Sequence, residues 1–192
     1  TVIDALKTTV QEGYDHPILE WAKGSKLIML TAHRRENLGQ PMEHMFNAVN
    51  RILNEFEDVK VVYPIHKNPK VRELASKVFG DNERMKIIEP LEVIDFHNFM
   101  NQSYMILTDS GGVQEEAPSL GKPVLVMRDT TERPEAVEAG TVILVGTDKE
   151  KIVSNVSKLL TDHNHYQQMA KAINPYGDGK ACERIVNILL SL

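Results

Sequence analysis

Short apolar runs alternate with amphipathic segments along most of the chain. Lys26–Thr31 is apolar without a period of two, which is the pattern of a strand buried on both faces of a sheet. Similar runs recur further along and predict about six strands in all. The other five are expected at Val61–Tyr63, Met85–Ile88, Tyr104–Thr108, Pro123–Met127 and Val142–Val145.

Helical patterns follow these strands. Apolar side chains between Met42 and Phe56 recur every three or four residues, and Pro41 suits the first turn of such a helix. Strands that alternate with helices through short turns form a parallel sheet with helices on both faces. We therefore predict a doubly wound, Rossmann-like α/β domain over residues 25–192. Further helices are expected at Val71–Val78, ended by Gly80, at Leu91–Met100, from Gly111-Gly112, at Ile152–Leu160 and at Lys180–Leu190.

The first 24 residues do not fit this alternation. Thr1–Gly24 is a polar helical segment that leads into Pro17. Its apolar residues find no partner before the first predicted strand. We expect this segment to be a connector between domains. The apolar residues in question are Val2, Ile3, Leu6 and Val10.

Composition narrows the class of protein. A length of 192 residues suits one large domain or two small ones, and a net charge of −5 argues against a nucleic-acid groove. The single cysteine, Cys182, excludes an internal disulfide and a cysteine-rich zinc site. No apolar run has the length of a membrane span, and the first residues lack a signal-peptide pattern. We expect a soluble, cytoplasmic protein that binds neither nucleic acid nor membrane.

Polar residues gather directly after four predicted strands. In an open parallel sheet, ligands bind outside the carboxyl ends of the strands. The four post-strand segments would line one rim of the domain, and their convergence is more informative than any one of them. These segments are Thr31–Asn37, Pro64–His66, Asp109–Gly112 and Arg128–Arg133.

Ser110-Gly111-Gly112 follows a strand and opens a predicted helix. Two glycines permit close backbone approach, and free amides with the helix dipole favour a phosphate there. The alternative is an ordinary turn with Ser110 as the N-cap residue. Glu116, in the next turn, could accept two hydrogen bonds from a ribose diol, or it could be a solvated helix glutamate.

Basic residues occur in two of the rim segments. Arg34 and Arg35 follow His33 and suit phosphate contacts, but they could instead pair with Glu36 on the surface. Arg133 stands at the entrance of a helix that Pro134 begins. A phosphate contact and a surface salt bridge are equally compatible with its position.

Other histidines and aromatic residues are better explained by structure than by chemistry. His66 is interpreted as a loop histidine bonded to backbone. Phe96 and Phe99 have the periodicity of core residues, although an aromatic ring facing the rim could stack on a base. His163 and His165 diverge on a helix and have no third ligand, so we expect no metal site.

Four long motifs resemble a known family. Thr31–Asn37 (TAHRREN), Tyr63–Pro69 (YPIHKNP), Leu107–Arg128 and Asp129–Thr141 together resemble the non-hydrolysing UDP-N-acetylglucosamine 2-epimerases. The resemblance covers nearly the whole chain but only the carboxy-terminal half of such an enzyme. Thr1–Lys7 is similar to the segment that joins the family's two domains. The resemblance implies one half of a glycosyltransferase-B-like architecture, in which two Rossmann-like domains hold a UDP-sugar in the cleft between them.

The resemblance also implies roles for individual residues. His33 matches the active-site histidine that assists the departure of UDP. The family often has a polar side chain where Leu91 stands, so the uracil contact there is expected from the backbone. The implied UDP-binding residues are Leu91, Phe96, Ser110, Gly111, Gly112, Glu116 and Arg133, and Arg34 and His66 would contact a second, activating UDP-GlcNAc molecule.

The implied reaction interconverts UDP-GlcNAc and UDP-ManNAc for cell-envelope polysaccharide precursors. UDP leaves by elimination to give a glycal, and then re-adds after reprotonation of C2 from the other face. The reaction requires no metal, nicotinamide or other cofactor. The family's acids and bases at C2 lie on the other domain, so we expect the chain alone to bind UDP weakly and to be inactive. The intact protein is expected to be a homodimer.

Two alternatives remain open at this point. The chain could be the UDP-binding half of a glycosyltransferase of the same fold, because a glycine-rich turn and a ribose glutamate suit both classes. It could also be a non-catalytic domain that senses UDP-sugars. The His33–Asn37 stretch (HRREN) favours the epimerase over the transferase.

Overall fold

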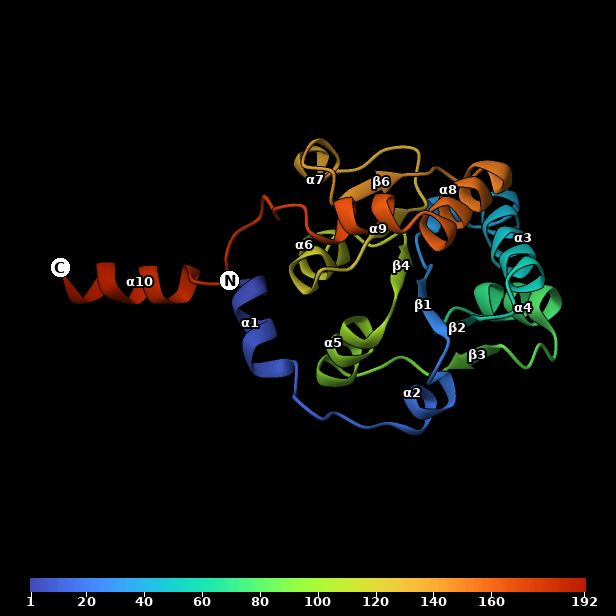
Figure 1. Ribbon diagram of the computed structural model, residues 1–192, viewed down its shortest axis with the longest axis horizontal. Helices are drawn as coiled ribbons and strands as arrows, with labels where there is room; N and C mark the ends of the chain where they lie inside the picture. The colour runs from blue at the N-terminus through green and yellow to red at the C-terminus, as the bar shows by residue number, and fades with distance from the viewer.

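The sheet is parallel throughout and has six strands in the order β3-β2-β1-β4-β5-β6 (Figure 1). The computed structural model describes residues 1–192. This strand order is that of the doubly wound dinucleotide-binding folds, in which the chain reverses direction across the sheet between the first and fourth strands. The predicted fold class is confirmed. The strands are β1 (Lys26–Thr31), β2 (Val59–Pro64), β3 (Met85–Ile88), β4 (Met105–Thr108), β5 (Val124–Val126) and β6 (Val142–Leu144).

All six strands were located by their apolar runs: β1 and β3 have the predicted ends, and the ends of the other four differ by at most two residues. The largest change is in β2, which begins at Val59 rather than Val61 because Val59 pairs with Lys26 and is fully buried. The polar Lys60 between them does not break the strand. Its Nζ reaches past the sheet to the Trp21 carbonyl and stands 4.9 Å from the centre of the Trp21 ring.

Helices cover both faces of the sheet. On one face lie α3 (Gln40–Glu55), α4 (Pro69–Phe79), α8 (Lys149–Thr161) and α9 (His163–Ala170). On the other lie α2 (Pro17–Ala22), α5 (Val93–Gln102), α6 (Val113–Glu116) and α7 (Pro134–Glu138). Short 3₁₀ turns at Arg35–Asn37 and Ala117–Leu120 complete the rim. The expected helix at Gly111-Gly112 therefore begins two residues later and ends after one turn.

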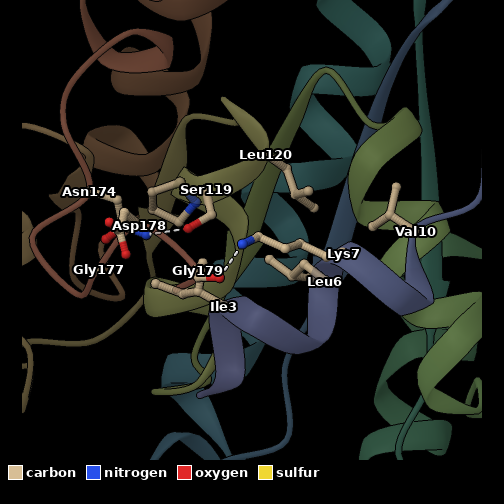
Figure 2. Close-up of a pocket in the computed structure, with 11 residues that line it drawn as sticks. Ile3, Leu6, Lys7, Val10, Ser119, Leu120, Asn174, Gly177, Asp178 and Gly179 are labelled. Atoms are coloured by element: carbon tan, nitrogen blue, oxygen red, sulfur yellow. Dashed lines mark hydrogen bonds between the residues drawn. The ribbon is translucent and has the colours of Figure 1, made fainter. Parts of the chain in front are cut away.

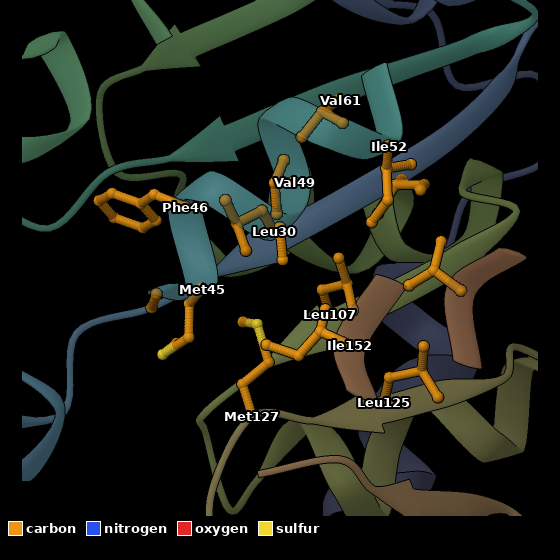
Figure 3. Close-up of a cluster of buried hydrophobic side chains, with 14 of the residues drawn as sticks. Leu30, Met45, Phe46, Val49, Ile52, Val61, Leu107, Leu125, Met127 and Ile152 are labelled. Atoms are coloured by element: carbon orange, nitrogen blue, oxygen red, sulfur yellow. The ribbon is translucent and has the colours of Figure 1, made fainter. Parts of the chain in front are cut away.

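Two apolar clusters hold the layers together. Figure 3 shows the larger one, in which Leu30, Leu107 and Leu125 from three neighbouring strands meet Phe46 of α3 and Ile152 of α8. Alternate residues of the same strands face the second cluster below α5 and α6. Because each strand is buried on both faces, its sequence is continuously apolar rather than alternating.

The amino-terminal segment packs on the domain. In α1 (Val2–Thr9), Ile3 and Leu6 are buried against α5 and α6, and α2 buries Leu19 and Ala22 in the second cluster. The sequence indicated no partner for the apolar residues of this segment before β1, and Ile3 and Leu6 do find theirs beyond it. The partners lie on α5 and α6, about a hundred residues further along the chain, where local periodicity cannot indicate them.

The carboxy-terminal helix, α10 (Ala181–Leu190), extends away from the body of the domain (Figure 1). It has no buried residue, and an apolar stripe that includes Ile185, Ile188 and Leu189 is exposed. Its first turn is tied to α1, because the Cys182 amide donates to Asp4 Oδ1 at 2.8 Å. None of the helices has the length and apolar composition that a membrane span requires.

We expect Leu6→Ala to lower the free energy of unfolding by about 2–4 kcal/mol, because it removes a buried side chain from the contact between α1 and the domain. Urea denaturation measures this change. Thr8→Ala, at an exposed position of the same helix, is the matched control and should change stability by less than about 0.5 kcal/mol. Equal, small effects of both substitutions would contradict the packing of α1.

Candidate functional site

The central feature of the rim is the contact between the ends of β1 and β4. Thr31 pairs with Thr108, and their hydroxyl oxygens lie 2.5 Å apart in a buried hydrogen bond. The segments that follow these strands are therefore neighbours in space. They are His33–Asn37 and Asp109–Gly112, and 76 residues of sequence separate His33 from Asp109. This is the point of strand-order reversal, where open α/β sheets have their binding crevice.

Asp109 joins the two segments. Its carboxylate is fully buried, and Oδ2 accepts hydrogen bonds from the His33 amide at 2.9 Å, the Arg34 amide at 2.8 Å and Asn37 Nδ2 at 3.2 Å. Oδ1 faces His33 Nδ1 at 3.2 Å. Sequence analysis placed Asp109 on the rim but assigned it no role. The available signal was a charged residue directly after a fully apolar strand.

The glycine turn, Gly111-Gly112, carries two backbone N–H donors without acceptors within the protein. Neither residue has a positive φ, and a Cβ built on Gly112 would meet nothing within 4 Å. Neither backbone conformation nor packing therefore requires glycine at 112. The absence of side chains instead keeps the space beside the amides free, as an anion site requires.

Ser110 does not cap a helix. Its amide donates to Thr108 Oγ1 at 2.9 Å, and the N-cap position of α6 belongs to Gly112. The alternative reading of Ser110 as N-cap is wrong, because the helix begins later than the sequence suggested. The Ser110 carbonyl accepts from Gln114 Nε2 at 3.0 Å, which holds the turn against the start of α6.

Glu116 lies at the end of α6 in an apolar, largely buried position. Burial raises its pKa to about 6, and the neighbouring Glu115 charge raises it further. Its Oε2 lies 3.8 Å from Nε2 of His97 on α5, whose pKa burial lowers. The other ring nitrogen of His97 is 2.7 Å from Thr9 Oγ1 on α1. Glu116 is therefore not the solvated glutamate of the alternative reading.

Phe96 and Phe99 have different environments. Phe99 is fully buried in the second cluster, whereas Phe96 lines a pocket of about 200 Å³ at the crevice. His33, Leu91 and Ser110 are among the other lining residues. Both rings pack on the second cluster, as the periodicity indicated, but only Phe99 is fully buried. Periodicity placed both on one side of α5 but could not distinguish the buried sheet from the open rim.

A second hollow of about 480 Å³ lies on the other side of His33. The ring of His66 stacks on that of His33, with centroids 5.8 Å apart and planes 17° apart. The hollow is entirely polar and includes Arg34 to Glu36 and Asn68. Arg34 Nε donates to the Asp109 carbonyl at 3.2 Å, and its guanidinium lies beside Gly111. Arg34 thus stands between the hollow and the glycine turn.

Two further rim arginines, Arg128 and Arg133, are paired within the protein. Arg133 forms a salt bridge with Glu115, so in this state the salt-bridge alternative describes it. The Thr131 hydroxyl accepts from the Arg133 amide at 3.0 Å and donates to Gln114 Oε1 at 2.6 Å, which fixes this loop to α6. A third of the Arg133 side chain stays exposed toward the rim.

Arg128 has a structural role that the sequence did not reveal. It is buried and bonds both Glu36 and Glu132, and its guanidinium lowers the pKa of Glu132 to about 2. The expected pairing of Arg34 or Arg35 with Glu36 is therefore wrong, because Arg128 takes that carboxylate. The pair spans 92 residues of sequence, so no local pattern indicates it.

The largest pocket lies elsewhere. Figure 2 shows this hollow of about 510 Å³ between α1 and the Asn174–Gly179 loop. Its charged residues are already engaged, since Lys7 donates to the Gly179 carbonyl and Asp178 pairs with Arg184. Its walls include none of the polar residues that follow the strands at the carboxyl edge of the sheet, where ligands bind in open parallel sheets. We therefore place the functional site at the β1–β4 crevice despite its smaller volume.

We expect Glu116 to titrate near pH 6 in a carbon-detected NMR titration. Because its folded-state pKa lies above the unfolded value of 4.5, the folded protein binds this proton more tightly. Stability should therefore fall by about 1–2 kcal/mol as pH rises through this window, and Glu116→Gln should remove that fall. Exposed Glu138→Gln is the control. An ordinary glutamate titration at Glu116 would contradict its burial.

Comparisons with known proteins agree with this geometry. The sequence model of the family described as UDP-N-acetylglucosamine 2-epimerase matches residues 1–190. A Bacillus subtilis protein named UDP-N-acetylglucosamine 2-epimerase is 66% identical over 190 residues, which are 99% of this chain and 50% of that protein. The chain spans about half the length of the curated relatives it matches.

Among solved structures, some resemble the chain in both sequence and fold, and others in fold alone. The UDP-GlcNAc 2-epimerase of Neisseria meningitidis, solved with UDP-GlcNAc bound, is 42% identical, with a TM-score of 0.89 over 100% of this chain and 54% of that one. The carboxy-terminal domain of a group 1 glycosyl transferase from Francisella tularensis shares the fold alone, at 14% identity and a TM-score of 0.67 over 93% of this chain and 97% of that one. The sequence match and the fold together show that the chain belongs to the UDP-N-acetylglucosamine 2-epimerase family and corresponds to the carboxy-terminal half of such an enzyme.

Proposed function

We propose that this chain is the nucleotide-binding half of an enzyme that interconverts UDP-GlcNAc and UDP-ManNAc. The observation that carries the proposal is the pair of unbonded backbone amides at Gly111 and Gly112, which lie between Ser110 and Val113, two residues that line the pocket at the β1–β4 junction. Anions bind to such backbone donors, and membership of the UDP-N-acetylglucosamine 2-epimerase family supports the diphosphate of UDP as that anion.

The three parts of UDP fit three parts of the crevice. The diphosphate would take the amides of Gly111 and Gly112 next to Ser110, with Arg133 exchanging its Glu115 contact for a phosphate oxygen. The ribose diol would donate to Glu116, once that carboxyl is ionised. The uracil would occupy the pocket between Phe96 and the backbone at Leu91.

The chemistry of this half is the stabilisation of a leaving group. In the proposed reaction, a base removes the C2 proton, the C1–O bond breaks, and its electron pair leaves on the diphosphate. Backbone amides, Arg133 and His33 would stabilise the charge that develops on that oxygen. Elimination is redox-neutral, so the proposal requires no nicotinamide, and the charge stabilisation by these protein groups would take the place of a metal. The acids and bases at C2 belong to the half that this chain lacks.

We infer that residues 25–192 form the UDP-binding domain and that residues 1–24 lead into it from an amino-terminal domain. The helix α1 within that segment contacts α5 and α6, which also carry Phe96 and Glu116. The exposed apolar stripe of α10 supports a missing partner domain, because such stripes are normally covered. The glycosyltransferase alternative has only a fold-level likeness in its favour.

Several finer expectations belong to the same proposal. The polar hollow beside His66 and Arg34 would hold a second, activating UDP-GlcNAc molecule. The intact enzyme would be a cytoplasmic homodimer that supplies precursors for cell-envelope polysaccharides and does not bind nucleic acid or membrane. A net charge of −5 supports the exclusion of nucleic acid.

We expect Gly112→Ala to weaken UDP binding by about tenfold or more, because the new methyl group fills the space beside the free amides. The fold should tolerate the change within about 1 kcal/mol, since φ at Gly112 is −62° and a Cβ meets no neighbour. Calorimetric titration with UDP and urea denaturation measure the two effects. Unchanged affinity for UDP would exclude the glycine turn as the diphosphate site.

Activity separates the proposed function from its alternatives. We expect this chain alone to show no turnover, because the groups that act at C2 are absent. The intact protein should convert UDP-GlcNAc to UDP-ManNAc without any sugar acceptor, as proton NMR of the mixture would reveal. Turnover only after an acceptor is added would indicate a glycosyltransferase, and binding without turnover a sensor. Epimerase activity of the chain by itself would contradict the assignment of roles to the two halves.

A further inference from the structure

We propose that Asp109 is a positioning residue for His33, which holds the imidazole in the tautomer whose Nε2 is free to face the crevice. The catalytic consequence of this inference rests on the proposed epimerase function. The tautomer itself can be measured whether or not the enzyme is an epimerase.

The carboxylate of Asp109 has one oxygen for the backbone and one for the ring. Oδ2 is saturated by three donors, namely the amides of His33 and Arg34 and the side-chain amide of Asn37. Oδ1 is buried and accepts no hydrogen bond in this geometry, but His33 Nδ1 lies 3.2 Å from it. Asp109 therefore fixes the loop with one oxygen and aims the other at the ring.

This arrangement selects one tautomer. An ionised carboxylate oxygen can only accept, so the ring nitrogen that faces it must carry hydrogen. With the proton on Nδ1, neutral His33 presents the lone pair of Nε2, and the imidazolium presents an N–H there. The other groups around the ring do not impose the opposite choice. Arg34 and Arg35 cannot accept a proton, and His66 stacks face to face instead of bonding edge to edge.

The consequence for the proposed reaction concerns the departing UDP. When the C1–O bond breaks, its electron pair goes to a diphosphate oxygen, and protonated His33 can give that oxygen its Nε2 proton. The imidazole is then neutral with Nδ1–H still facing Asp109 Oδ1, and Asp109 takes up no proton in the step. The C2 proton goes separately to the base on the other half. Asp109 is fully buried, so in this proposal it acts only through His33.

Asp109→Asn tests the proposal, because the structure dictates how the new amide must orient. Three donors surround the Oδ2 position, so the amide oxygen must lie there. The amide nitrogen is then directed at His33 Nδ1, where it can only donate. The loop keeps its three hydrogen bonds, but His33 must move its proton from Nδ1 to Nε2. A merely structural role for Asp109 would produce no such exchange.

The first measurement is nitrogen-15 NMR of the His33 ring in this chain, at a pH where the imidazole is neutral. We expect hydrogen on Nδ1 in the unsubstituted chain and on Nε2 in Asp109→Asn. Asp58→Asn is the matched control, since Asp58 pairs with Lys26 at the amino end of β1, on the opposite edge of the sheet. It should leave the tautomer unchanged. Hydrogen on Nε2 in the unsubstituted chain overturns the proposal without any variant, as does an unchanged tautomer in Asp109→Asn.

The second measurement is turnover by the intact protein. We expect Asp109→Asn to lower kcat by about 100-fold or more, while the dissociation constant for UDP changes less than about threefold. A matching loss of UDP affinity would show that Asp109 shapes the nucleotide site instead, which overturns the positioning role. If the unsubstituted protein is no epimerase, the proposed function fails but the tautomer result still stands.

Discussion

The parallel pairing of β1 with β4 is the constraint on which the site depends. Thr31 and Thr108 lie opposite each other at the last positions of the two strands. Because the chain runs to opposite edges of the sheet from these two strands, their following segments open a crevice between them. Asp109 then bonds the two segments across this junction. A shift of one residue in this register would point Thr108 and Asp109 to the wrong faces and separate His33 from the glycine turn.

Arg128 and Arg133 at the rim are neutralised by glutamates, whereas the backbone donors of the glycine turn have no acceptor within the protein. Arg128 bonds two glutamates, and Arg133 bonds Glu115, so neither contributes a free positive charge in the absence of ligand. The amides of Gly111 and Gly112 have no internal partner. A protein with a net charge of −5 can therefore still offer an anion site, because local fixed dipoles act at shorter range than the overall charge.

The strands of the sheet could be predicted from the sequence because they are buried on both faces and are therefore continuously apolar. The four rim segments could also be predicted, because parallel strands bring their carboxyl ends to one edge. Contacts between residues distant in sequence could not be predicted. Examples are the packing of Ile3 and Leu6 on α5 and α6, the salt bridge of Arg128 with Glu36, and the approach of Asp109 to His33. These depend on which strands are neighbours, and local periodicity carries no information on strand order.

The most direct test of the account is a crystal structure of this chain with UDP. The account predicts the diphosphate on the amides of Gly111 and Gly112, the ribose beside Glu116 and the uracil against Phe96. UDP bound in the larger hollow between α1 and the Asn174–Gly179 loop, or a crevice filled by side chains when UDP is present, would contradict it.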